Sequence, residues 1–284
     1  MRNCLKYLYF FCTNIINSII SLLSVLFFSS FQSNNMINQC RKKYKKFNEC
    51  VIMGNGPSLS SFLENNFDET LDKNILAVNF FCTSRYFERV KPSFYVLLDP
   101  SLFSKPVPEG IGNQIKELTV KLNSISWPMV LFIPSRFKNS SLIQQLKNNC
   151  LMVIPFNSTP ISGISVIENY FFKRNLGMPV PETVINASIF LAIALKFKSI
   201  HLYGVEQSWL KHLTVDSENK ISVGLPHFYS GSDKTDEYRP LSEFLFSQAK
   251  VFKSHMRLNE YAKFLGIRVI NHTPGSYIDA YERI

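Results

Sequence analysis

The turn Gly54-Asn55-Gly56-Pro57-Ser58 holds the residues best suited to chemistry, and it directly follows a short buried strand predicted at 48–53. Glycines allow close backbone approach, and the helix predicted from Leu59 presents free N–H groups and a positive dipole end to an anion. Asn55 can also hydrogen-bond a phosphate or a sugar. The turn therefore predicts an anion site, although it is neither the dinucleotide-binding GxGxxG nor a lysine-bearing P-loop. An ordinary strand-to-helix turn, with Ser58 as the helix cap, is the alternative.

Polar or glycine-containing turns also follow four later strands that the sequence predicts. These strands cover residues 74–78, 94–98, 199–203 and 267–270. The residues after them are Asn79, Asp99, Gly204 and the run Pro274-Gly275-Ser276. Parallel strands end at the same edge of a sheet, so we expect these residues to converge on one crevice with the Gly54–Ser58 turn. Each of them could instead cap a helix or form a local turn.

Short apolar strands alternate with helices along the rest of the chain. Two more strands are predicted at 129–133 and 151–154, an Ala- and Ile-rich helix at 183–195, and a long amphipathic helix at 241–264. This alternation predicts an α/β, Rossmann-like fold with a mostly parallel sheet and helices on both faces. The polar stretch 207–239 is expected to be a mobile excursion that forms a lid over the crevice.

Histidines and carboxylates are the candidates for acid–base chemistry. His227 lies within the excursion and has the titration range that suits a general base, with a structural role as the alternative. Asp99 and Asp233 are the carboxylate alternatives. His272, at a strand end, is a second histidine that could face a ligand, whereas His255 is expected on the surface of its helix.

An apolar N-terminal segment is followed by a basic cluster. Residues 7–31 contain no charged side chain, and a helix of this length can cross a hydrocarbon core of ~30 Å. A helix lying on the membrane surface and a cleaved signal peptide are the alternatives. Five Lys or Arg residues at 41–46 predict a single-pass anchor with the main domain in the cytoplasm. The predicted organisation is an anchor and basic linker at 1–46 and one domain at 47–284.

The formal net charge of +10 has its densest part in this cluster beside the apolar segment. A basic balance can indicate nucleic acid, anionic lipid or an anionic substrate as the partner, and the position of this cluster favours lipid. Nucleic acid is not expected, because no zinc-knuckle, RNA-recognition or helix-turn-helix signature is present.

Four segments together resemble the bacterial sialyltransferases of glycosyltransferase family 42. They are VIMGNGPSL at 51–59, AVNFF at 77–81, DPSLF at 99–103 and TVINASIFLAIALKFKSIHLYGVE at 183–206. The segment HFYSGSDKTD at 227–236 is similar to a further motif of that family. More distantly, the first turn and the turn at 273–276 resemble the pterin-pyrophosphokinase-like superfamily.

The resemblance implies an inverting transfer of sialic acid, or of a related acidic sugar, from a CMP-sugar to a surface-glycan or glycolipid acceptor at the inner membrane. It implies no metal and no cofactor, since the CMP-sugar is itself the donor substrate. The lack of an Asp-x-Asp or CxxC pair agrees with this expectation. Asn55, Asn79 and Thr183 match donor-contact positions of the family.

Three departures from the family mark the chain as divergent. Asp99 replaces an asparagine and places a carboxylate near the anionic donor. Val184 and Ile185 replace the Ser and Gly that contact the sialic acid carboxylate. Gly231 stands at the position of the general-base histidine, so His227 becomes the expected base.

Two other functions stay open at the level of sequence. One is a different nucleotide-dependent transferase or pyrophosphokinase of the same superfamily. The other is a catalytically inactive, membrane-anchored scaffold that retains the fold. The expected partners are the nucleotide-sugar donor, the acceptor and the membrane, and self-association into a homo-oligomer is also open.

Overall fold

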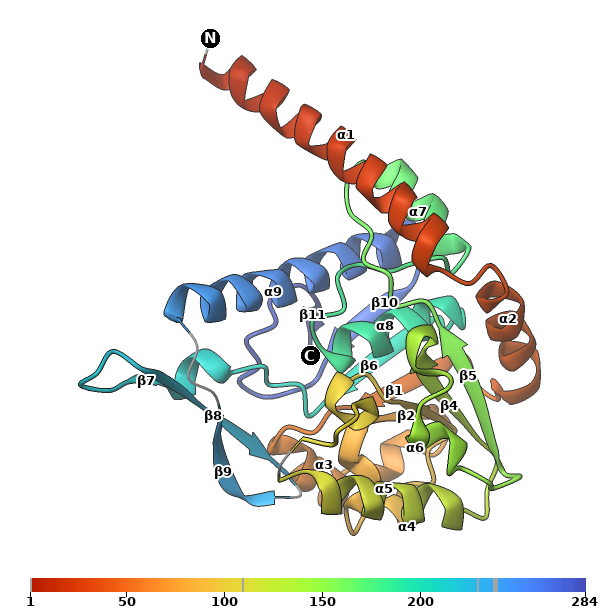
Figure 1. Ribbon diagram of the computed structural model, residues 1–284. Helices are drawn as coiled ribbons and strands as arrows, with labels where there is room; N and C mark the ends of the chain where they lie inside the picture. Colours follow the sequence, from red (N-terminus) through yellow and green to blue (C-terminus); the bar gives the residue numbers. More distant parts are fainter. Residues whose placement is uncertain (1, 109, 229, 237–239) are drawn as a thin grey trace.

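The fold is α/β, as the sequence predicts, and is built on one eight-stranded sheet (Figure 1). The computed structural model describes residues 2–108, 110–228, 230–236 and 240–284, with backbone only for residues 2–4, 225–227 and 230–236. The strand order is β11-β10-β6-β1-β2-β3-β4-β5. The strands are β1 (Glu49–Met53), β2 (Asn74–Val78), β3 (Phe94–Val96), β4 (Met129–Pro134), β5 (Leu151–Phe156), β6 (Ser199–Tyr203), β10 (Arg268–Asn271) and β11 (Glu282–Arg283). Every described pairing in this sheet is parallel.

Successive strand residues feed two hydrophobic cores, one on each face of the sheet. In β1, Ile52 joins one core, whereas Val51 and Met53 join the other. This period-2 alternation is what a sheet covered on both faces requires. The first core is closed by α7 (Ser165–Lys173), α8 (Val184–Ala194) and α9 (Leu241–Phe264). The second is closed by α3 (Ser58–Asn65), α4 (Phe87–Val90), α5 (Gly112–Ser124) and α6 (Ser141–Gln144).

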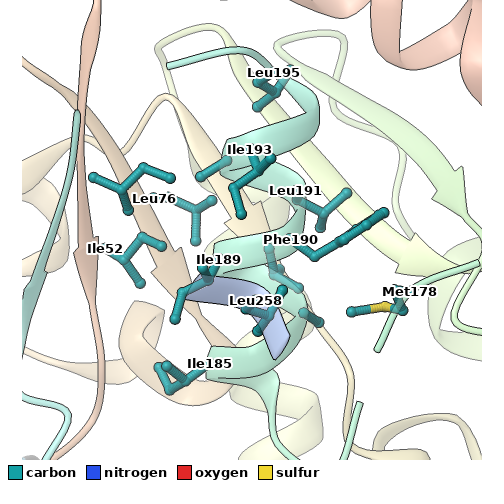
Figure 2. Packing of buried hydrophobic residues seen from close by; sticks show 14 of the residues in the cluster. Ile52, Leu76, Met178, Ile185, Ile189, Phe190, Leu191, Ile193, Leu195 and Leu258 are labelled. Atoms are coloured by element: carbon teal, nitrogen blue, oxygen red, sulfur yellow. The ribbon is translucent and has the colours of Figure 1, made fainter. Parts of the chain in front are cut away.

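Helix α8 is apolar on every side because it is buried between the sheet and α9. Figure 2 shows its Ile189 and Ile193 beside Ile52 and Leu76 of the central strands, with Leu258 of α9 nearby. Thr183 caps this helix in a reciprocal capping box with Asn186, which sets the start of α8 at Val184. The helix predicted at 183–195 is therefore confirmed to within a residue at each end.

The described part of the excursion at 207–239 contains regular secondary structure, and its mobility and its role as a lid stay predictions. It contains the short 3₁₀ helix η5 (Trp209–His212) and a three-stranded antiparallel sheet. The strands are β7 (Leu213–Val215), β8 (Ile221–His227) and β9 (Ser230–Asp236). Ile221 and Val223 are buried and pack with Phe244 of α9, so a small hydrophobic cluster of its own holds this sheet to the domain.

The N-terminal region forms two helices, α1 (Arg2–Phe28) and α2 (Ser33–Tyr44). The stretch Leu5–Phe28 is long and apolar enough, by length and composition, to cross a membrane. Helix α2 covers most of the stretch expected to be a basic linker, and it packs on the domain instead. Ile37 and Cys40 of α2 are fully buried in the first core.

Candidate functional site

A cavity of about 760 Å³ opens at the carboxyl edge of the parallel sheet. It lies where the chain order reverses, since β1 is flanked by β2 on one side and by β6 on the other. Open α/β sheets bind ligands at such a switch point, because the two flanking connections diverge to opposite faces there. The strand ends contribute Asn55, Asn79, Asp99, Arg136, Ser158 and Gly204 to its wall. Thr183, Gln207 and His212 line it from the elements that follow β5 and β6.

The turn after β1 is held against the end of β6. The Gly54 N–H donates to the Tyr203 carbonyl (2.8 Å) and the Gly56 N–H to the Gly204 carbonyl (2.9 Å). A Cβ atom at Gly56 would lie 1.6 Å from Oε2 of Glu206. Glycine at this position is therefore required by the protein's own packing, before any ligand is considered.

Glu206 occupies the anion position that the sequence predicted at the start of α3. Its Oε1 accepts the Ser58 backbone N–H at 2.7 Å, and the residue is only 9% exposed. A carboxylate is stabilised at a helix N-terminus by the free N–H groups and the dipole. The expected cap by Ser58 was wrong: α3 begins at Ser58, Pro57 stands at the cap position, and neither side chain caps the helix. The chain thus fills this site with its own carboxylate.

Two asparagines tie neighbouring strand ends together at the cavity. Asn55 donates from Nδ2 to the Val78 carbonyl (3.4 Å), and Asn79 accepts the Leu98 N–H at Oδ1 (3.3 Å). Asn79 adopts a positive φ of 44°, a conformation that asparagine tolerates better than most residues. The backbone carbonyl of Asn79 also accepts the Tyr95 hydroxyl at 2.6 Å. Both side chains are thereby oriented at the cavity wall.

Asp99 lines the cavity and also caps the short 3₁₀ helix η3 (Pro100–Phe103). One of its carboxylate oxygens accepts both the backbone N–H and the hydroxyl of Ser101, at 2.9 and 2.7 Å. The local-turn alternative for Asp99 is thus present in the structure. That oxygen is engaged in capping, so a role as a base would fall to the other one.

A chain of hydrogen bonds reaches the cavity from Tyr281, the residue before the edge strand β11. The Tyr281 hydroxyl lies 2.9 Å from Nδ1 of His255, and His255 Nε2 lies 2.9 Å from Oε1 of Gln207. Gln207 donates from Nε2 to the Thr183 hydroxyl (3.3 Å), which donates to Oδ1 of Asn186 (2.9 Å). Because Gln207 Oε1 can only accept, His255 carries its proton on Nε2 and accepts from Tyr281 at Nδ1. We name this chain the Tyr281–Thr183 relay.

His255 is fully buried in this relay, so its expected surface position was wrong. Desolvation by burial lowers the pKa of its imidazole to about 3. His255 is therefore neutral at physiological pH. The relay requires this, because Nδ1 of His255 must accept the Tyr281 hydroxyl while Nε2 donates to Gln207. Gln207, with a positive φ of 44°, is the relay member that also lines the cavity.

The charged groups on the cavity wall differ in whether an opposite charge or a helix N-terminus lies beside them. Glu206 lies at a helix N-terminus, and Glu182 pairs with Lys250 at 3.5 Å. Arg136, in the short 3₁₀ helix that follows β4, contributes a guanidinium that forms no ion pair with any described residue. Arg136 is thus the cation of the wall that is available to an incoming anion.

The other predicted site residues lie behind the cavity or outside the described side chains. Ser276 is buried: its hydroxyl donates to the Val205 carbonyl (2.8 Å) and accepts from Asn271, so the Pro274-Gly275-Ser276 turn supports the loop after β6 from behind. His227 ends β8, but its side chain lies outside the described part. His272 stacks on Tyr203 and is not on the wall.

Sequence reasoning missed Arg136, Glu206 and Gln207. Arg136 lies three residues after the strand predicted at 129–133. It could have been found as Asn79 and Asp99 were, because polar residues after the carboxyl ends of parallel strands line the ligand crevice. Glu206 and Gln207 lie three and four residues after β6, and two and three residues beyond the predicted Gly204. Their partners are distant in sequence, and only the fold brings them together.

The family model for 6-hydroxymethylpterin diphosphokinase MptE-like proteins matches residues 27–212. A search of curated proteins found no match. Among solved structures, the MAf glycosyltransferase from Magnetospirillum magneticum AMB-1 aligns with a TM-score of 0.48 and 13% sequence identity. The alignment covers 89% of this chain and 38% of that one, so this chain spans well under half of that protein. The matching family is the one resembled more distantly in sequence, and the sialyltransferase assignment remains a proposal.

Proposed function

Because the chain belongs to the 6-hydroxymethylpterin diphosphokinase MptE-like family, we propose that it is a transferase acting on a nucleotide-activated substrate. The observation that carries the proposal is the cavity at the sheet switch point. Five of the predicted donor-binding residues line it together with Arg136, namely Asn55, Gly56, Asn79, Thr183 and Gly204. Its volume falls within the range of roughly 300–1,000 Å³ that is usual for small-molecule sites.

Our leading candidate is glycosyl transfer from a CMP-sugar, with sialic acid or a related acidic sugar as the group transferred. A CMP-sugar has one phosphate, and one guanidinium with one helix N-terminus can neutralise it without a metal. Arg136 supplies the first, and the start of α8 at Thr183, Val184 and Ile185 supplies the second. The acceptor in this proposal is a hydroxyl of a glycan or glycolipid.

The family description favours a second candidate, diphosphate transfer from a nucleoside triphosphate to a pterin. A triphosphate brings several more negative charges, which proteins usually meet with additional cations and a divalent metal. Arg136 is the only Lys or Arg among the described residues of the wall. That balance of charge supports the donor with a single phosphate.

Thermal unfolding of the full chain with a nucleotide panel tests the proposal. We expect CMP and CMP-sialic acid to raise the Tm, and magnesium ATP to raise it little. Arg136→Ala should weaken CMP binding by about tenfold or more, since a charge-assisted hydrogen bond contributes about 1.5–3 kcal/mol. The matched control is Lys138→Ala, an exposed cation two residues away that does not line the cavity.

Three other outcomes reassign the protein. Stabilisation by ATP but not by CMP would favour the diphosphokinase candidate. Binding of CMP-sialic acid without any release of CMP, with or without acceptors, would favour an inactive scaffold. Equal loss of CMP binding in Arg136→Ala and Lys138→Ala would remove Arg136 from the site.

A further inference from the structure

The second half of α1 is docked on the domain by one face of the helix. Ser18, Ser21, Val25 and Ser29 recur at helical spacing, and Val25 is 2% exposed within the first core. Figure 1 shows this half of α1 alongside α7, while the first half projects beyond the body of the protein. The serines that weaken the segment as a transmembrane helix are therefore the residues that hold it to the domain.

Hydrogen bonds to the loop before α7 secure this docking. Ser21 and Ser162 form a reciprocal pair, with the Ser21 hydroxyl donating to the Ser162 carbonyl (2.8 Å) and accepting the Ser162 N–H (2.9 Å). The Ser18 hydroxyl accepts the Ile164 N–H at 2.9 Å. A Cβ atom at Gly163, whose φ is +136°, would lie 2.2 Å from the Ser18 hydroxyl. The backbones of the helix and the loop thus approach as closely as glycine allows.

While α1 stays docked, the part of it that projects beyond the domain is too short to cross a bilayer. Contact begins at Asn14, whose carbonyl lies 2.8 Å from that same Cβ position at Gly163. Only residues 2–13 project beyond the docked half, and they span about 18 Å at 1.5 Å per residue. The hydrocarbon core is about 30 Å thick. Spanning would require α1 to leave the domain, break these hydrogen bonds and uncover Val25.

The outward face of α1 continues onto α7 as one apolar surface. Ile16, Ile20 and Leu23 are about half exposed on α1, and Val166 and Tyr170 are 78% and 51% exposed on α7. An apolar groove lies between the two helices. It is lined by Ile15, Ser18, Ile19, Leu22, Ile164, Ile167 and Phe171. We call this the α1–α7 surface.

The exposed charges on α1 and α7 are positive, because Glu168, the acidic residue of α7, is buried and paired with Arg257. The first acidic residue of the chain is Glu49, whereas Lys6 lies on α1 and Lys173 and Arg174 end α7. The Arg174 guanidinium lies 3.8 Å from the ring centroid of Tyr170, and tyrosine is a residue that is enriched at membrane interfaces. Apolar residues edged by cations match a leaflet of anionic lipid.

We propose that α1 is an in-plane anchor, and that the α1–α7 surface inserts into one leaflet of an anionic bilayer without crossing it. The loop that receives α1 also borders the cavity, since Ser158 and Pro160 are on its wall. Asn157 and Thr159, which alternate with these two wall residues along the loop, form hydrogen bonds with Ser30 and Ser29 just after the end of α1. The docked anchor thereby holds the cavity in a set orientation to the membrane.

The position of the two chain ends tests the proposal without any assay of activity. The full chain is produced with an epitope tag before Met1 or after Ile284, and antibody access is measured in right-side-out and inside-out membrane vesicles. We expect both tags to be accessible in inside-out vesicles only. Tags on opposite sides would overturn the in-plane anchor.

A pair of valines tests whether α7 enters the lipid. Val166 on α7 and Val120 on α5 are both exposed helix residues, at 78% and 66%, but Val120 lies on the opposite face of the sheet. With vesicles of phosphatidylglycerol and phosphatidylcholine in equal parts, Val166→Lys should weaken partition of the full chain by about tenfold. Val120→Lys should leave it unchanged. Equal partition of the two variants would overturn insertion of the α1–α7 surface.

Discussion

His212 and His227 are the two histidines between residues 207 and 239, and each is a candidate for the general base. His212 lies on the cavity wall, while His227 ends β8. An inverting sugar transfer needs a group that removes the proton of the acceptor hydroxyl as the new bond forms. Asp99 is a weaker choice, because one of its oxygens caps η3.

We expect His227→Ala to lower the turnover number by at least about 10²-fold and to leave CMP binding nearly unchanged, since a positioned general base contributes about 10²–10⁴-fold. His212→Ala is the matched variant, and it should lower turnover by less than tenfold. Steady-state kinetics with a CMP-sugar decide between them. The reverse ranking would assign the base to His212, and two unaffected variants would point to Asp99.

Polar residues at the ends of predicted strands were enough to identify part of the cavity wall. They did not predict which charged groups lie there. Asn55, Asn79 and Gly204 were found because each follows a predicted buried strand, and the structure places all three at the cavity. The charge at the α3 N-terminus could not be found in the same way. Glu206 reaches Ser58 across 148 positions of sequence, and only the pairing of β1 with β6 brings the two together.

At the scale of elements, the Tyr281–Thr183 relay joins the region before β11, α9, the loop after β6 and the cap of α8. Each member donates in one direction, so the relay holds only while His255 is neutral. Burial lowers the His255 pKa to about 3, whereas an unfolded histidine titrates near 6.5. Below pH 6.5 the unfolded chain therefore binds a proton that the folded chain excludes, and folding stability falls as the pH drops toward 3.

His255→Gln should remove this pH dependence, because a glutamine can accept from Tyr281 and donate to Gln207 without titrating. Between pH 7 and 4.5 the parent protein should lose about 2–3 kcal/mol more unfolding free energy than the variant. Urea unfolding of both proteins at the two pH values measures the difference. Parallel losses would show that protonation of His255 is not coupled to folding. His201 and His272, whose pKa values burial also lowers, affect both proteins alike.

Elements with strong hydrophobic patterns were predicted well, and weakly patterned ones were not. The bounds of β2, β6 and α9 agree with the prediction residue for residue, since each is a sustained apolar or amphipathic run. Helix α2 was taken for a linker because its buried face consists of little more than Ile37 and Cys40 among basic and polar residues. Among the described side chains of the β7–β9 sheet, only Ile221 and Val223 are buried hydrophobics, so the pattern of this stretch suggested a loop.

At the scale of the whole molecule, the packing of α2 favours a folded unit that begins before α2 rather than at residue 47. Ile37 and Cys40 are buried against the first core, and Met36 and Tyr44 pack against it as well. Asn74 then links the end of this region to β2. It accepts the Lys46 N–H at 3.0 Å and donates to the Phe47 carbonyl at 3.0 Å. A protein that begins at Phe47 loses the whole of this cover from one face of the sheet.

A truncated protein that begins at Gln32 should therefore be more stable than one that begins at Phe47. Burial of a single Ile side chain contributes about 1.5–3 kcal/mol, and α2 adds the partial burial of Met36 and Tyr44. We therefore expect the two unfolding free energies to differ by about 3 kcal/mol or more in urea.

Ile37→Ala in the full chain isolates the main contact of α2, with an expected loss of about 2–5 kcal/mol of unfolding free energy. Asn35→Ala, on the exposed side of α2, is the matched control and should change stability by less than about 0.5 kcal/mol. Equal stability of the two truncated proteins would mean that α2 is a dispensable linker after all, and it would place the start of the folded unit at β1.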